Sequence, residues 1–116
     1  MQIYSLETFK KKNEMSRIEK IIEMLAASEK DSFLQHALAL EYIKIGNKED
    51  ALKLFIDLLG ENPGYVGSYY HLGKLHESMG GVDKAIATYE QGMAEAKKSG
   101  DQHAYNELMG AKEELE

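Results

Sequence analysis

The residues with the greatest chemical potential in this chain lie together in one short stretch, residues 69–81 (YYHLGKLHESMGG). The stretch contains two tyrosines, two histidines, a lysine and a glutamate, which are side chains that bind metals or transfer protons in many proteins. His71 and His76 are five residues apart, which separates them by about 140° around a helix. A zinc-binding pair on a helix needs a spacing of four residues. We therefore predict that neither histidine is a metal ligand and that His76 is a packing residue.

Other patterns of catalytic residues are missing from the sequence. The carboxylate pairs Glu49-Asp50 and Glu113-Glu114 fall in polar segments, where no pocket would separate their pKa values for acid–base catalysis. The chain has no cysteine and no G-x-S-x-G sequence. Gly80-Gly81 lacks the following Lys-Ser/Thr of a phosphate-binding loop. We therefore expect no enzymatic activity, no catalytic residue, no cofactor and no metal.

The composition is that of one ordinary globular domain. Of the 116 residues, 43% are hydrophobic and 29% are charged, and the formal net charge is −6. A nucleic-acid-binding protein needs a concentrated basic surface, whereas the one basic run here is Lys10-Lys11-Lys12. The sequence has neither an apolar run that could span a membrane nor the apolar centre of a secretory signal. We expect no nucleic acid and no membrane as partners, and a cytoplasmic location.

The sequence repeats with a period of 34 residues. Between residues 32–65 and residues 66–99, the identical pairs at this spacing are Leu38 and Leu72, Gly46 and Gly80, Ala51 and Ala85, and Glu61 and Glu95. A period of this length indicates structural repeats that are each built from two packed helices. Small residues such as Ala51 and Ala85 would let the paired helices approach closely. Gly46 and Gly80 would end the first helix of each pair in the left-handed conformation.

The register of these residues resembles the tetratricopeptide repeat (TPR), a helix–turn–helix unit. The second copy reads Tyr69-x2-Leu72-Gly73-x2-His76 and then Ala85-x3-Tyr89, while the first reads Gln35-x2-Leu38-Ala39-x2-Tyr42, then Ala51-x3-Phe55, and closes with Pro63. The chain departs from the family pattern at Gln35, His76, Gly92 and Lys97, where an aromatic residue, a tyrosine, an alanine and a proline are usual. The resemblance implies an all-α fold, a short α-solenoid of antiparallel helix pairs with N- and C-terminal capping helices.

The repeat register also predicts how the chain is organised. Residues 1–14 are expected to be an N-terminal extension of uncertain role, and residues 15–116 a single TPR-like domain. The domain is divided into a half repeat (16–30), two full repeats (32–65 and 66–99) and a capping helix (101–115). In the half repeat we expect a helix at 17–28, with Ser16 and Glu19 as its capping box. The remaining helices are expected at about 32–45, 48–60, 65–79 and 82–98.

The resemblance further implies a binding surface, because members of the family hold ligands against the first helix of each repeat. By register, the residues of this concave groove are Phe33, His36, Leu40 and Lys44 in the first copy, Tyr70, His71, Lys74 and Glu77 in the second, and Tyr105 and Leu108 in the capping helix. The implied function is that of a non-catalytic adaptor or scaffold that binds an unknown protein or peptide, as a helix or an extended segment. The alternative is a self-associating structural subunit, a homodimer that uses the same apolar faces.

One subtype of the family grips the C-terminal carboxylate of its ligands with Lys, Asn and Arg side chains. His36 and Leu40 stand at the first Lys and Asn positions here, and only Lys74 is basic in the second copy. We therefore do not expect that clamp. The net charge of −6 favours a neutral or basic partner instead.

Overall fold

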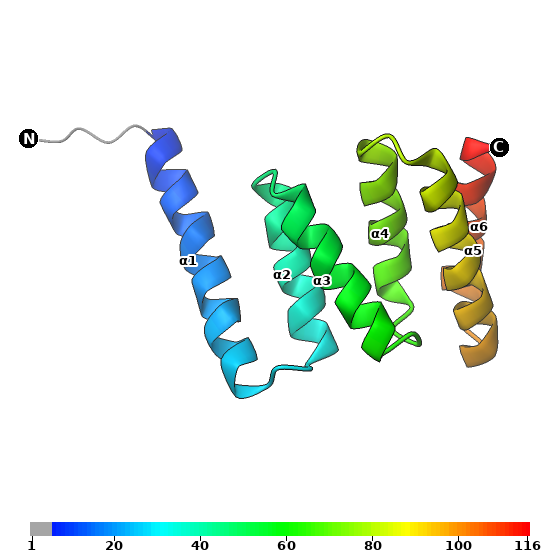
Figure 1. Ribbon diagram of the computed structural model, residues 1–116, viewed down its shortest axis with the longest axis horizontal. Helices are drawn as coiled ribbons and strands as arrows, with labels where there is room; N and C mark the ends of the chain where they lie inside the picture. Colours follow the sequence, from blue (N-terminus) through cyan, green and yellow to red (C-terminus); the bar gives the residue numbers. More distant parts are fainter. Residues whose placement is uncertain (1–5) are drawn as a thin grey trace, which may run out of the picture. The chain divides into compact units, whose positions relative to one another are not determined.

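The computed structural model describes the backbone of residues 6–116 and the side chains of residues 17–116. The described residues form six α-helices (Figure 1): α1 (Leu6–Ala27), α2 (Ser32–Lys44), α3 (Lys48–Glu61), α4 (Gly67–Ser78), α5 (Val82–Ser99) and α6 (Gln102–Leu115). They contain no β-strand, and the all-α fold predicted from the sequence is confirmed. The predicted limits of α2 to α6 agree with the structure to within two residues at each end.

The first helix is longer than predicted. It begins at Leu6 and therefore enters the range 1–14 that we expected to be an extension; residues 1–5 lie outside the described part of the chain. Ser16 lies inside α1, so the predicted capping box of Ser16 and Glu19 is wrong. The run Lys10-Lys11-Lys12 does not interrupt the helix, because lysine has a high helix propensity.

The chain contains two compact units, with the boundary between Leu54 and Phe55 inside α3. In the first unit α1 packs against α2, and Arg17 on α1 forms an ion pair with Glu41 on α2 at 3.4 Å. Among the side chains that the structure describes in this unit, the buried hydrophobic residues are Ile18, Leu38, Ala39 and Ala51. The single domain predicted for residues 15–116, with its division into repeats, stays a prediction.

In the second unit α4, α5 and α6 pack against one another in alternating directions (Figure 1). Their buried core cluster consists of Tyr69, Ala85, Tyr89, Leu108 and Ala111. The hydroxyl group of Tyr69 donates a hydrogen bond of 2.6 Å to the carbonyl oxygen of Pro63, which ties the loop before α4 to this core. α6 buries one face and exposes the other, as expected of a capping helix.

The small residues and turn glycines occupy the places predicted for them. Ala51 and Ala85 are both 0% exposed, as helix pairs with closely spaced backbones require. Gly46 and Gly80 have φ angles of 83° and 80°, in the left-handed region that glycine adopts without steric strain. After Gly80, the amide of Gly81 donates a hydrogen bond of 2.8 Å to the carbonyl oxygen of His76, which closes the end of α4.

Candidate functional site

One face of α4 carries three of the predicted groove residues. Tyr70, Lys74 and Glu77 follow one another at spacings of four and three residues, so they lie within about 60° of each other around the helix. The neighbouring residues Tyr69 and Leu72 point into the core. The Nζ atom of Lys74 lies 5.5 Å from the centroid of the Tyr70 ring, which is within the range of a cation–π contact. The same atom lies 3.6 Å from Oε2 of Glu77.

The other two helices of the second unit add to this face. From α6, Glu114 brings its Oε2 atom to 4.0 Å from Nζ of Lys74. From α5, the hydroxyl group of Tyr89 donates a hydrogen bond to Oε2 of Glu77. The rings of Tyr89 and Tyr70 lie with their centroids 6.5 Å apart. The Lys74 ammonium group therefore lies over an aromatic ring and near carboxylates from two helices.

His71 borders the same face. Its ring meets that of Tyr70 edge to face, with centroids 5.8 Å apart. Burial lowers the pKa of His71, and the nearby carboxylate of Glu107 on α6 partly opposes this effect. Glu107 and Glu114 are seven residues apart, so they lie on one side of α6. We call the set formed by Tyr70, His71, Lys74 and Glu77 of α4 with Glu107 and Glu114 of α6 the α4–α6 surface.

The groups on the α4–α6 surface are suited to binding a ligand by charge and by ring contacts. Burial and the hydrogen bond to Glu77 raise the pKa of Tyr89, so its hydroxyl group stays protonated and acts as a donor.

Burial, followed by the charge of Lys84, lowers the pKa of His76, which is partly buried on α4 as expected of a packing residue. Among the described residues, no three His, Asp or Glu side chains come together in a way that would hold a metal ion.

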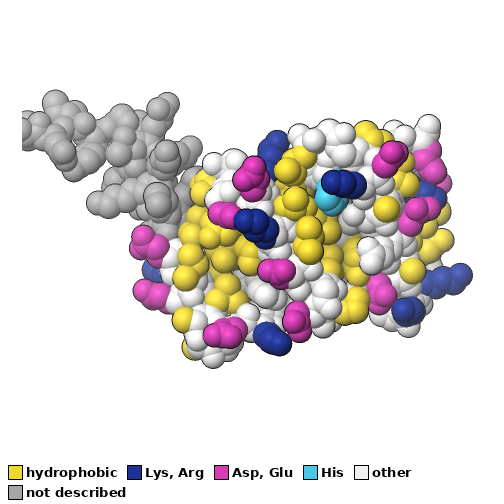
Figure 2. Space-filling view, viewed as in Figure 1, with side chains coloured by type: hydrophobic (Ala, Val, Ile, Leu, Met, Phe, Trp, Pro, Cys, Tyr) yellow, Lys and Arg dark blue, Asp and Glu magenta, His cyan; other side chains and the backbone are white. Residues whose placement is uncertain are grey.

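The groove residues predicted for the first copy lie on α2, in the first unit. Phe33 is 66% exposed, His36 and Leu40 are partly buried, and Lys44 is exposed. Lys44 forms an ion pair with Glu41 at 3.4 Å. Hydrophobic side chains also reach the surface over α1 and α2 on the face drawn in Figure 2. Among residues 17–54, Ile22, Met24 and Phe33 are the large hydrophobic residues with the highest exposed fractions, 45%, 54% and 66%.

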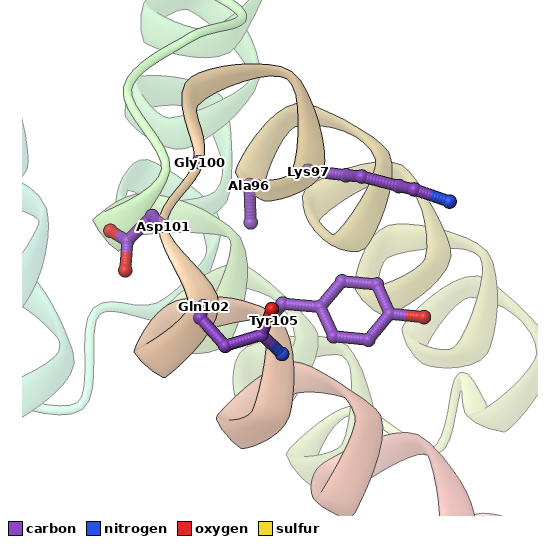
Figure 3. Close-up of a pocket in the computed structure, with 6 residues that line it drawn as sticks. All are labelled: Ala96, Lys97, Gly100, Asp101, Gln102 and Tyr105. Atoms are coloured by element: carbon purple, nitrogen blue, oxygen red, sulfur yellow. The ribbon is translucent and has the colours of Figure 1, made fainter.

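The two residues predicted from the capping helix do not join the α4–α6 surface. Leu108 is 2% exposed and belongs to the core cluster. Tyr105 precedes Glu107 by two residues, or about 200° around the helix, and therefore faces elsewhere. It lines a cavity of about 260 Å³ at the turn between α5 and α6, together with Ala96, Lys97, Gly100, Asp101 and Gln102. Figure 3 shows its ring and the Lys97 side chain extending along the same side of this cavity.

Tyr89, Glu107 and Glu114 were not predicted as part of the site. In the sequence, Tyr89 was identified only as a position of the repeat pattern. A seven-residue spacing of two acidic residues was visible in the sequence. It became informative only when the packing of α6 showed which face lies beside α4.

No described helix is both long enough and apolar enough to cross a lipid bilayer.

Known proteins are similar to this chain in sequence and in structure. The family model described as "Tetratricopeptide repeat" matches residues 66–98. A TPR repeat-containing protein of Pseudomonas aeruginosa is 30% identical over 91 residues, which cover 78% of this chain and 87% of that protein. Among solved structures, a tetratricopeptide repeat domain protein from Salinibacter ruber is 46% identical with a TM-score of 0.72, covering 74% of this chain and 87% of the other. A protein of Bordetella parapertussis is 28% identical with a TM-score of 0.73, covering 84% and 85% of the two chains.

Proposed function

This chain belongs to the tetratricopeptide repeat family, and from that premise we propose that it is a non-catalytic adaptor that binds a peptide or helix of another protein on the α4–α6 surface. The TPR fold is in general that of a protein-interaction module. The observation that carries the proposal is the placement of Lys74, over the ring of Tyr70 and within 4.0 Å of carboxylates from two helices.

The composition of the α4–α6 surface supports a role in recognition. Tyrosine is enriched at protein interfaces, because its ring buries a large apolar area while its hydroxyl group still meets polar partners. Here a partly buried Tyr70 is surrounded by charged side chains, and Glu114 at the edge is 76% exposed. An aromatic anchor within a polar rim is the usual arrangement of a binding surface.

The proposal is tested by quantitative affinity capture from a cell lysate. Tyr70→Ala removes the ring, and Glu114→Lys reverses a charge on the α4–α6 surface without disturbing the core. We expect both variants to lose the proteins that the unmodified chain retains, while their far-UV circular dichroism shows the same helix content. Tyr105→Ala and Glu113→Lys are matched controls, because they make the same changes at exposed or partly exposed positions outside that surface. Equal recovery of the same proteins by all four variants would show that the α4–α6 surface is not the binding site.

The alternative function, a self-associating structural subunit, is favoured by a separate observation on the first unit. Phe33 is 66% exposed and Met24 is 54% exposed, and large exposed apolar side chains often mark contacts between copies. Sedimentation velocity at micromolar concentration tests this function. A dimer that dissociates in the Phe33→Ser variant would support it, whereas a monomer across the concentration range would rule it out.

A further inference from the structure

The net charge of this protein is distributed unevenly along the chain. The segment Phe55–Glu116 has 11 acidic and five basic side chains and thus carries a formal charge of −6, equal to that of the whole chain. The preceding 54 residues have nine of each and are balanced. A partner that binds the second unit therefore meets a negative electrostatic field, which speeds the approach of cationic ligands and disfavours anionic ones.

The α4–α6 surface includes one lysine, Lys74, whose ammonium group is positively charged. Its distances to Glu77 and Glu114, 3.6 and 4.0 Å, are longer than those of direct hydrogen bonds. Its side chain is 39% exposed and has four flexible carbons. Such partly exposed ion pairs are weak, so Lys74 is free to swing away from the ring of Tyr70.

The groups around Lys74 are held more firmly than the lysine itself. Glu77 accepts the hydrogen bond from Tyr89, whose ring is 0% exposed in the core. Tyr70 packs against the same core. If Lys74 moves out, it leaves behind an aromatic ring and a fixed carboxylate, with Glu114 nearby. This is a ready-made acceptor for a cationic side chain.

We propose that the α4–α6 surface binds a basic peptide segment of a partner protein, and that an arginine of that segment replaces Lys74 above Tyr70. This inference rests on the proposed adaptor function and names its class of partner. Arginine fits better than lysine, because its planar guanidinium group stacks on an aromatic ring while it forms paired hydrogen bonds with a carboxylate. Lys74 then acts as an internal competitor that rejects weakly basic or neutral segments.

The test begins with three pools of nine-residue peptides that have basic, neutral or acidic composition. Fluorescence anisotropy with the full chain should detect binding of the basic pool, and raising the salt concentration should weaken it. The best basic peptide is then compared with versions in which each arginine is replaced by lysine or by the neutral isostere citrulline. We expect the order of affinity arginine, lysine, citrulline at one position.

Variants of the protein test the role of Lys74. Lys74→Met should tighten binding of the basic peptide by roughly threefold to tenfold, because the internal competitor is removed. Lys112→Met is the matched control: it also removes one positive charge, but Lys112 pairs with Glu90 and Glu116 at 3.4 and 3.8 Å, and neither carboxylate belongs to the α4–α6 surface. Glu77→Gln should weaken binding by about tenfold, since the carboxylate that faces the guanidinium group is lost.

Several results would overturn the inference. One is preferential binding of the acidic or neutral pool, and another is an equal gain in affinity for Lys74→Met and Lys112→Met. A second copy of the chain seated on this surface, seen as a dimer that the basic peptide dissociates, would also overturn it. If no pool binds while lysate capture still depends on Tyr70, the choice of a basic partner is wrong but the adaptor function stands. If both experiments are negative, both proposals fail.

Discussion

Gly73 on α4 and Tyr89 on α5 share a space that holds only one side chain. A Cβ atom at Gly73 would lie 2.1 Å from Cε1 of the Tyr89 ring and 2.5 Å from Cζ. The Tyr89 ring cannot move away from an added Cβ atom, because Tyr89 is 0% exposed and its hydroxyl group donates a hydrogen bond to Glu77. The absence of a side chain at Gly73 thus lets α4 and α5 pack around a large aromatic residue, and it places that residue where it orients Glu77.

Gly73→Ala should therefore lower the free energy of unfolding by about 1–3 kcal/mol, the usual cost of overpacking a filled core. The loss exceeds the gain in helix propensity of up to about 1 kcal/mol. Gly110→Ala is the control, because Gly110 lies inside α6 with nothing within 4 Å of an added Cβ atom. It should stabilise the protein by about 0.5–1 kcal/mol. Urea unfolding followed by circular dichroism measures both, and a stabilised Gly73→Ala variant would contradict the packing described here.

Gly92→Ala is expected to be destabilising, although alanine is the usual residue at this position of the family. An added Cβ atom would lie 2.6 Å from Cβ of Tyr69 and 2.9 Å from Cδ1 of Leu108. The Cβ atom of Tyr69 is fixed to the backbone of α4, so relief requires a shift of the helices. We expect a loss of about 1–3 kcal/mol by the same overpacking mechanism. Thermal unfolding that shows a higher midpoint for Gly92→Ala would refute this expectation.

Tyr89→Phe should reduce the free energy of unfolding by about 1 kcal/mol, because the hydrogen bond to Glu77 is lost while the ring remains. The Glu77 side chain is 25% exposed, so water replaces part of the lost interaction. Tyr105→Phe, at a partly exposed position of α6, should change stability by less than about 0.5 kcal/mol. Equal urea midpoints for wild type and Tyr89→Phe would mean that this hydrogen bond contributes nothing to stability.

Stability should fall as the pH drops below 6.5, partly because of His71 and His76. Burial lowers the pKa of both side chains below the ordinary value of 6.5, so between pH 6.5 and their folded-state pKa values the unfolded chain binds more protons. The contribution of these groups to stability is therefore complete above pH 6.5 and is lost as the pH falls through that window. Unfolding free energies of the double variant His71→Gln/His76→Gln should depend less on pH than those of the wild type between pH 7 and pH 5. Parallel curves would contradict the assignment.

The helices were predictable because their causes are local. Gly46 and Gly80 terminate α2 and α4 by a backbone conformation that only glycine adopts easily, and Asp31 caps α2 with a hydrogen bond of 3.0 Å from the amide of Leu34. The start of α1 was missed because the polar run from Lys10 to Asn13 was interpreted as weakening a helix, although Ser5, Leu6 and Phe9 could have started one.

The site was predictable only in part. Tyr70, Lys74 and Glu77 share a face of α4 through helical spacing alone. Leu108 was assigned to the groove by the register of the repeat, but this residue of α6 is packed into the core. Glu114 could not be identified in advance, since its approach to Lys74 depends on how α6 is rotated against α4.

The sequence by itself determined that this chain forms short helices at a 34-residue repeat, with small residues where two helices cross and glycines where the chain turns. Those features follow from steric limits that act over a few neighbouring residues. Only the tertiary structure decided that Tyr89, Glu107 and Glu114 meet the α4 residues, because side chains from separate helices come together according to the distance and rotation between helices. That geometry is set by the packing of Tyr69, Tyr89 and Leu108 in a shared core.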